Sequence, residues 1–269
     1  MSNPQQPKLS LRERRRRLVW VKVAAGSAVV ALSFVAVWFL ARIPATTIAS
    51  IEVKGTSIVS ADEVKKLVEE KLDGSYAYWI PHRNSLLFPK RNIENAVAIA
   101  FPPLAKITIS RNGFNALTVT TEERMATALW CDGATEEEAC YSIDKNGFIF
   151  ASATDATPTI RFYGALSSVP IGSTYLDGGF ASLNTLVTGI ASSIHRIPET
   201  VIVDGTSNDV ELAFADGGVL KFVRTTSNQQ ATLENIASVF ASQSFKKNKE
   251  FEYADFRFGD KVYIKFKGE

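Results

Sequence analysis

The sequence predicts an α+β protein: a single N-terminal transmembrane helix, a β-α-α-β-β domain, and a larger, mostly antiparallel β domain with two flanking helices. Three observations support this prediction. Nineteen consecutive residues near the N-terminus carry no charge, a strand and two helical segments follow, and short apolar runs separated by turn residues dominate from Arg124 onward. We place the segments at residues 1–19 (basic tail), 20–41 (helix), 48–123 and 124–269.

The uncharged run extends from Val23 to Ala41, "VAAGSAVVALSFVAVWFLA". At about 1.5 Å per residue it reaches roughly 28 Å, close to the roughly 30 Å hydrocarbon core of a bilayer. Residues 1–22 contain seven basic residues and one acid, a net charge of +6, so that the remainder carries −4. We therefore expect residues 20–41 to cross the plasma membrane once, with the tail in the cytoplasm and the chain after about Arg42 outside.

A cleaved signal peptide is the alternative for this segment, with Ala45 or Ala49 near the cut. A cleavable apolar region is usually about 7–15 residues long, which favours an uncleaved anchor. The cluster "RERRRR" could also bind anionic lipid or RNA, although orientation alone accounts for it. Because the basic excess is confined to this tail, nucleic-acid binding by the main body is not expected.

The first outer domain, residues 48–123, is expected to run strand, helix, helix, strand, strand. After the strand "IEV", Ser60 to Glu63 is a capping-box signature that begins an amphipathic helix. A long aromatic loop at Tyr76–Phe88 precedes a second helix near Asn92–Ala100. Alternating residues in 104–124 then predict a hairpin.

The second outer domain begins with short strands in "MATALWC", "CYSIDKNGFIFASA" and "PTIRFYG". Asp144–Gly147 is a hairpin-turn sequence. A helix at Phe180–Ile197, closed by Pro198, is followed by three strands that end near Arg224, and a further helix lies near Gln229–Gln243. The chain finishes with a hairpin.

Two turns are possible in the last hairpin, "FEYADFRFGDKVYIKFKGE". A two-residue turn at Gly259-Asp260 would mix polar and apolar residues on both faces. A three-residue loop at 259–261 would leave one face apolar, because it pairs Phe258 with Val262, Phe256 with Ile264, and Ala254 with Phe266. Since a one-residue slip exposes the whole apolar set, we predict the three-residue loop.

Cys131 and Cys140 are the only cysteines. Both lie on the expected outer side, where a disulfide is permitted, and the acidic spacer "DGATEEEA" between them could close a small loop. We predict a disulfide, with free thiols as the alternative. A metal site would need more ligands, and the two histidines, His82 and His195, lie far away in the sequence.

Several motifs occur in an order that resembles the bacterial cell-division family FtsQ/DivIB. The opening "IEVKGTSIVSADEV" is similar to the start of that family's POTRA-type domain, and the ending "YADFRFGDKVYIK" is similar to its closing strand, with Phe256 in place of Leu. Between them lie a domain-junction motif and a hairpin motif: Glu123, Arg124, Ala128 and Trp130, then Asp144, Gly147 and Phe150. The cysteine pair and the long loop at Tyr76–Phe88 depart from the pattern.

The resemblance implies a non-enzymatic scaffold of the septum-assembly machinery at the division site. Its partners would be other single-pass divisome membrane proteins, FtsB/FtsL-like, which add an extended segment to an outer-face sheet edge. In the family, partner binding is placed at the C-terminal region. The candidate partner-binding residues are Tyr253, Phe256, Phe258, Val262, Tyr263, Ile264 and Phe266.

The charges Lys261, Lys265 and Lys267 would discourage indiscriminate pairing at such an edge. The plainer alternative is that these lysines are simply solvated and that the last strand is already covered by another part of the chain.

The motif residues also have structural explanations. Asp144 and Gly147 suit a tight turn, Trp130 suits a core, and Arg124 suits a cap or an ion pair at the domain junction. Asp255 and Arg257 could form cross-strand pairs.

No catalytic constellation, Gly-rich phosphate loop or metal-ligand spacing is present in the sequence. We therefore expect no cofactor, no metal and no small-molecule substrate. Two alternatives stay open: a membrane-anchored POTRA-containing component of an export or envelope-assembly apparatus, and an anchored wall-modifying enzyme with an unrecognised site.

Overall fold

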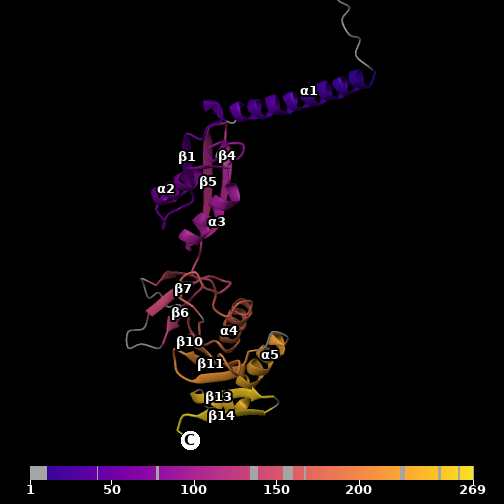
Figure 1. Ribbon diagram of the computed structural model, residues 1–269. Coiled ribbons are helices and arrows are strands. Elements are labelled where there is room, and N and C mark those ends of the chain that lie inside the picture. Colours follow the sequence, from indigo (N-terminus) through magenta and orange to yellow (C-terminus); the bar gives the residue numbers. More distant parts are fainter. Residues whose placement is uncertain are drawn as a thin grey trace, which may run out of the picture. The chain divides into compact units, whose positions relative to one another are not determined.

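The structure is a computed structural model, and it describes residues 11–40, 42–76, 79–133, 139–153, 160–166, 168–224, 228–247, 250–259 and 261–268. It confirms a mixed α+β protein with one N-terminal apolar helix and a large sheet (Figure 1). The chain divides into two compact units. One unit comprises Met1–Val97 and Ile107–Thr121, and the other comprises Ala98–Lys106 and Glu122–Glu269.

Helix α1 (Leu11–Leu40) contains the predicted apolar segment and continues back into the basic cluster. Its stretch Arg12–Leu40 is long and apolar enough to cross a membrane. Its large apolar side chains are exposed, as a lipid-facing helix requires. Just beyond its end, the Arg42 guanidinium lies 4.3 Å from the centre of the Trp38 ring. A short 3₁₀ helix, η1 (Pro44–Thr46), follows.

After η1 the chain has the predicted order of strand, helix, helix, strand, strand: β1 (Ser50–Lys54), α2 (Ala61–Leu72), α3 (Lys90–Ala100), β4 (Leu104–Asn112) and β5 (Ala116–Glu123). The sheet order is β1-β5-β4, and β1 runs parallel to β5 with Ser50 opposite Ala116. Both helices bury their apolar stripes, since Val64, Val68, Ile93 and Val97 are fully buried.

Two details of this unit differ from the expectation. Ser60 is the N-cap of α2, but its hydroxyl makes no capping hydrogen bond. The Ser60 carbonyl accepts from Val64 N, which is the ordinary first hydrogen bond of the helix. A small two-stranded sheet, β2 (Ser75–Tyr76) with β3 (Ile80–Pro81), also lies at the aromatic loop. It was not predicted, because strands of two residues are too short to show an alternating pattern.

The second unit is built on a nine-stranded sheet of order β14-β13-β12-β11-β10-β9-β6-β7-β8. Its strands are β6 (Ala128–Asp132), β7 (Ala139–Ile143), β8 (Ile149–Ser152), β9 (Arg161–Tyr163), β10 (Pro198–Val203), β11 (Asp209–Phe214), β12 (Val219–Val223), β13 (Phe251–Phe258) and β14 (Lys261–Phe266). Most neighbouring pairs are antiparallel, whereas β9 is parallel to both neighbours and β13 is parallel to β12.

Among the described residues, the helices that accompany this sheet are α4 (Phe180–Ile194), α5 (Gln229–Phe240) and α6 (Gln243–Lys247). The first ends before the predicted Ile197, because His195 adopts the left-handed conformation, with φ 56°, and Arg196 N turns back to Ala191 O. The predicted helix Gln229–Gln243 is interrupted after Phe240 and resumes as α6.

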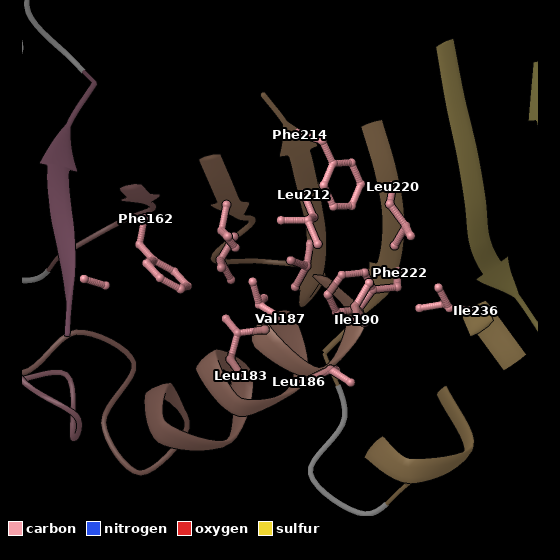
Figure 2. Close-up of a cluster of buried hydrophobic side chains, with 14 of the residues drawn as sticks. Phe162, Leu183, Leu186, Val187, Ile190, Leu212, Phe214, Leu220, Phe222 and Ile236 are labelled. Atoms are coloured by element: carbon pink, nitrogen blue, oxygen red, sulfur yellow. The ribbon is translucent and has the colours of Figure 1, made fainter. Parts of the chain in front are cut away.

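The core of the second unit lies between α4 and one face of the sheet (Figure 2). Leu183, Val187 and Ile190 project from α4 toward the strands. The sheet contributes the alternate residues Leu212, Phe214, Leu220 and Phe222, and Ile236 of α5 joins them. Because side chains alternate along a strand, the intervening residues of β11 and β12 lie on the opposite face of the sheet.

Candidate functional site

Strand β14 forms an open edge of the large sheet. Within the described residues it pairs with β13 alone, and no strand lies on its other side. The opposite edge, β8, is covered by a returning loop at its first residue, because Ile149 N donates to Ser173 O at 2.8 Å and Gly172 N donates to Ile149 O at 2.9 Å. In the first unit, the backbone N–H of Ile109 on β4 donates a hydrogen bond to Glu94 Oε1 at 2.9 Å. The described residues therefore leave β14 more open than either β8 or this part of β4.

The hydrogen-bonding groups on the open side of β14 can be assigned to residues. Lys267 N donates to Glu250 O, so this N–H points toward β13. Phe258 lies opposite Lys261 across the turn, the position where a two-residue hairpin has mutual hydrogen bonds. Backbone groups alternate in direction along a strand. The N–H and C=O groups of Val262, Ile264 and Phe266 therefore face the open edge.

The register of the last hairpin differs from our prediction. Phe258 pairs with Lys261, so two residues separate the paired positions and the predicted three-residue loop is wrong; Asp260 itself lies outside the described residues. The register then shifts, so that Asp255 lies opposite Tyr263 and Ala254 opposite Ile264. Our prediction assumed an unbroken alternation, whereas a β-bulge in β13 returns the apolar residues to the core face without lengthening the turn.

The seven candidate partner-binding residues fall into three groups. Phe256 and Phe266 are buried in the core, so neither side chain is available to a partner. Only Phe266 has its backbone groups at the open edge, because Phe256 lies on the inner strand β13. Tyr253, Val262 and Ile264 are partly buried. Phe258 and Tyr263 are 56% and 51% exposed, and their rings meet edge to face with centroids 5.2 Å apart. The exposed aromatic surface beside the edge is therefore this pair.

An ionic network crosses the face of the sheet opposite the helices. Arg257 donates to Asp255 Oδ1 and Oδ2, at 2.9 and 2.7 Å, and to Asp209 Oδ2 on β11 at 2.6 Å. These hydrogen bonds from Arg257 lower the pKa of Asp255, although burial opposes the change. They also raise the pKa of Arg257. The bulged end of β13 is thereby tied to β11 across the intervening strand.

A second ion pair lies beside this network. Lys221 Nζ on β12 donates to Glu211 Oε1 on β11 at 2.6 Å, and the charge of Lys221 contributes to the lowered pKa of Asp255. The sequence pattern did not indicate the parts played by Asp209, Glu211 and Lys221. Asp209 and Arg257 are 48 residues apart, so only the strand order could reveal their contact.

Two of the three C-terminal lysines are paired within the hairpin. Lys265 Nζ lies 2.6 Å from Glu252 Oε2, and this hydrogen bond raises the pKa of Lys265. Lys267 Nζ lies 3.7 Å from Glu250 Oε2. All three lysines are exposed, and Lys261 lies beside the turn.

The junction motif and the hairpin motif meet. Arg124 donates from Nε to Pro102 O at 3.0 Å and from Nη1 to Asp144 Oδ2 at 2.5 Å. The other carboxylate oxygen of Asp144 accepts from Asn146 N and Phe148 N, which builds the turn. Arg124 and Asp144 therefore act structurally, as an ion pair and a turn residue.

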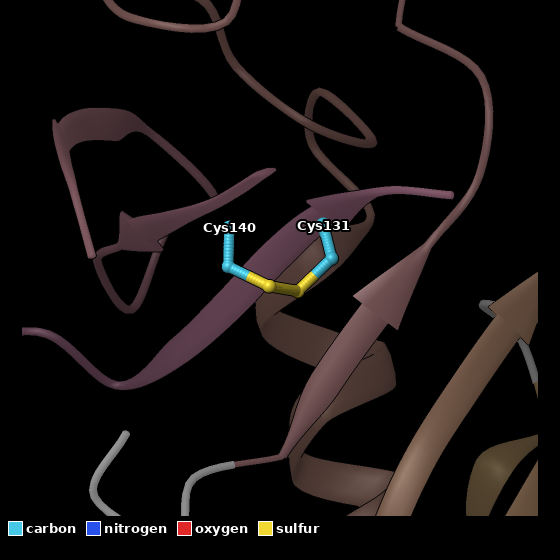
Figure 3. Close-up of a disulfide and its surroundings, with 2 residues drawn as sticks. All are labelled: Cys131 and Cys140. Atoms are coloured by element: carbon cyan, nitrogen blue, oxygen red, sulfur yellow. A yellow bond between two sulfur atoms is a disulfide. The ribbon is translucent and has the colours of Figure 1, made fainter. Parts of the chain in front are cut away.

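Trp130 and Cys131 lie on β6, and Cys140 lies on the neighbouring strand β7. The Trp130 ring is buried, and its Nε1 donates to Gly164 O at 3.2 Å. Cys131 lies directly opposite Cys140 of β7, and the two residues form a disulfide (Figure 3). The disulfide joins β6 to β7 near the connection between these two strands.

The described residues contain no group of three or more His, Cys, Asp or Glu that could hold a metal ion. His195 and two acids, Asp216 and Glu250, do line one pocket. Asp216, however, pairs with Arg196 at 3.0 Å, and the described part of the chain gives His195 no hydrogen bond to either acid. His82 packs its ring against Tyr76. Where the structure describes the chain, neither histidine is arranged as a base beside a nucleophile.

No model of a known protein family matches the chain, and no curated protein matches it in sequence. The family resemblance therefore depends on the sequence motifs alone.

Proposed function

We propose that this chain is a non-enzymatic, single-pass membrane scaffold of the bacterial septum-assembly machinery, of the FtsQ/DivIB type with a POTRA-type first domain. Helix α1 is the anchor, the basic tail is cytoplasmic, and both outer units lie beyond the plasma membrane. The partners are other single-pass divisome membrane proteins, FtsB/FtsL-like, and no cofactor or small-molecule substrate takes part.

The open edge at β14 is the observation that carries this proposal. Outward N–H and C=O groups at Val262 and Ile264 can accept an extended partner segment as a further strand. The exposed Phe258–Tyr263 pair stands beside the same edge and offers apolar contacts for the partner's side chains. Main-chain hydrogen bonds then supply affinity, and this aromatic pair supplies selectivity.

Substitution of Ile264 by proline tests strand addition directly. Proline removes the outward N–H of Ile264 without removing a hydrogen bond to β13, so the hairpin is expected to keep its fold. We expect Ile264→Pro to lose capture of FtsB/FtsL-like proteins from detergent-solubilised membranes. The matched control, Ile264→Ala, truncates the half-buried side chain but keeps the N–H, and it is expected to retain capture.

Folding of each variant is checked by urea unfolding of the purified full chain. A folded Ile264→Pro protein with unchanged capture would refute the docking assignment.

Localisation separates septum assembly from the alternative role in export or envelope assembly. A fluorescent fusion to the cytoplasmic tail is expected to form a mid-cell band in dividing cells. A uniform outline of the cell would favour the alternative.

A further inference from the structure

Four large apolar side chains are exposed at one end of the first unit. Trp79, Leu86, Leu87 and Phe114 are 54%, 57%, 48% and 72% exposed. They come from separate loops: the small β2–β3 sheet, the turn before α3, and the turn between β4 and β5. Isolated exposed apolar residues are common, but four at one end of a small unit require an explanation.

The turn that carries Leu86 and Leu87 is fastened to the segment that follows α1. Ser85 N donates to Thr46 O and Ile48 N donates to Arg83 O, both at 2.8 Å. The buried Asn84 side chain accepts from Leu86 N at 2.9 Å, which fixes the turn from inside. The two leucines are therefore held outward by a built turn.

The turn that carries Phe114 lies at the same end. β1 and β5 are parallel and start side by side, so the residues before β5 lie beside the residues before β1. Ala49 N donates to Asn115 O at 2.7 Å, which places Phe114 next to the linker from α1. Ile58, by contrast, follows the far end of β1 and is 70% exposed there.

The linker is too short to separate this end from the end of α1. Thr46 is six residues after Leu40, and a fully extended chain of that length spans at most about 20 Å. Three of these residues form η1, in which the chain advances by only about 2 Å per residue. The Trp79 ring itself meets Phe34 of α1 edge to face, with centroids 5.7 Å apart.

We propose that this end of the first unit is a second membrane contact, in which Trp79, Leu86, Leu87 and Phe114 insert into the outer leaflet beside α1. The inference rests on the proposed anchoring by α1. A side chain that meets Phe34, well inside the apolar stretch, lies at the depth of the headgroup boundary or below it. Tryptophan is the residue most suited to that boundary, and leucine and phenylalanine gain from leaving water. The outer units would then be held close to the membrane surface.

The test places an environment-sensitive NBD fluorophore on single cysteines in the full chain, with the disulfide left oxidised. Labels replace Leu86, Phe114 and, as a matched control, Ile58. A fourth label at Leu32, in the middle of α1, reports the span itself. Each protein is reconstituted in phosphatidylethanolamine–phosphatidylglycerol vesicles with and without spin-labelled lipid. We expect blue-shifted emission and quenching at Leu86, Phe114 and Leu32, and neither at Ile58.

The outcomes separate the two proposals. Quenching at Leu32 without quenching at Leu86 and Phe114 would overturn the second contact while leaving the anchor intact. No quenching at Leu32 would overturn the anchor and, with it, the second contact. Equal quenching at Ile58 and Leu86 would also contradict the inference, because it would mean that the whole unit lies on the membrane.

A second variant tests whether insertion of the turn at Leu86 and Leu87 causes the quenching. Leu87→Asp changes an exposed side chain and is expected to leave the folded unit intact. It should weaken the quenching of the label at Leu86, and unchanged quenching would contradict insertion of this turn.

Discussion

Arg257 holds the carboxylate of Asp255, two residues earlier on the same strand, by hydrogen bonds to both carboxylate oxygens. On a regular strand, residues two apart share a face but stand apart, and the bulge in β13 is the feature that accompanies this closer arrangement. The third hydrogen bond of Arg257, to Asp209, connects the terminal hairpin to β11.

Replacement of Asp255 by asparagine should reduce the free energy of unfolding by about 1–2 kcal/mol at pH 7, because it removes charge-assisted hydrogen bonds. The pKa of Asp255 is lowered in the folded protein, chiefly by Arg257. Its contribution is therefore present above the unfolded value of about 3.9 and is lost as pH falls through the folded pKa. Urea unfolding measures the free energy of unfolding of Asp255→Asn and of the parent at pH 7 and pH 3. The difference between these two free energies should be smaller at pH 3.

Asp177→Asn is the control for this comparison. Asp177 is an exposed acid in the same unit, and its replacement is expected to change the free energy of unfolding by less than about 0.5 kcal/mol. If the difference in free energy of unfolding between Asp255→Asn and the parent grew as the pH falls, the lowered pKa assigned to Asp255 would be contradicted.

Gly147→Ala should be strongly destabilising. Gly147 has φ +87°, and an added Cβ would lie 2.5 Å from Tyr175 O and 2.8 Å from Phe180 Cβ. Gly172 has nearly the same φ, +91°, but nothing within 4 Å of its Cβ position. We expect Gly172→Ala to cost about 1–2 kcal/mol from the backbone conformation alone and Gly147→Ala to cost about 1–3 kcal/mol more from crowding. Equal losses in urea unfolding would show that the crowding at Gly147 relaxes freely.

The disulfide predicts a defined change in mass. The intact protein should gain two hydrogens on reduction, and identical masses with and without reductant would dismiss the bond. The double variant Cys131→Ala with Cys140→Ala should lower the free energy of unfolding by about 2–3 kcal/mol, because the bond closes a short loop in the unfolded chain. Urea unfolding of the oxidised parent and of the double variant measures the loss.

Tyr263→Ala tests the aromatic pair at the edge. Tyr263 is exposed, so its removal should change the free energy of unfolding by less than about 1 kcal/mol. Loss of a ring contact with a partner should weaken binding by about ten-fold or more, in line with aromatic interface residues. Ile202, 48% exposed on β10, provides a control, and Ile202→Ala should leave capture unchanged. If both variants bound the partner equally, Phe258–Tyr263 would not be part of the docking surface.

Local signals predicted most of the elements. The apolar run at Val23–Ala41 predicted α1, and helical spacing from Val64 to Leu72 predicted α2. The glycine-containing turns after Asp204 and Asp216 predicted the boundaries of β10, β11 and β12. In each case the pattern repeats within one element, so neighbouring residues carry the information.

Register and capping were harder to predict. The hairpin prediction failed because the bulge in β13 makes the buried pattern irregular: Ala254, Asp255 and Phe256 are all buried in succession. The capping hydrogen bond expected from the Ser60 hydroxyl is absent, because a sequence signature does not fix the rotamer of the hydroxyl.

The candidate site was predictable as a segment but not as a surface. Alternation in residues 253–266 indicated two paired strands, yet Phe266 is buried against the Phe245 ring of α6, and Phe256 is buried in the core of the second unit. The open side of β14 follows from the order of nine strands, which short-range patterns do not contain.

Strand β9, Arg161–Tyr163, joins two antiparallel meanders that could each form from local contacts. It pairs with Leu129 and Trp130 on one side and with Thr200 to Ile202 on the other, all more than 30 residues away in the sequence. Such distant parallel pairing carries a large loop-closure cost and is slow to form. We expect this three-residue strand to be acquired after the folding transition state, so that weakening it accelerates unfolding and leaves the folding rate nearly unchanged.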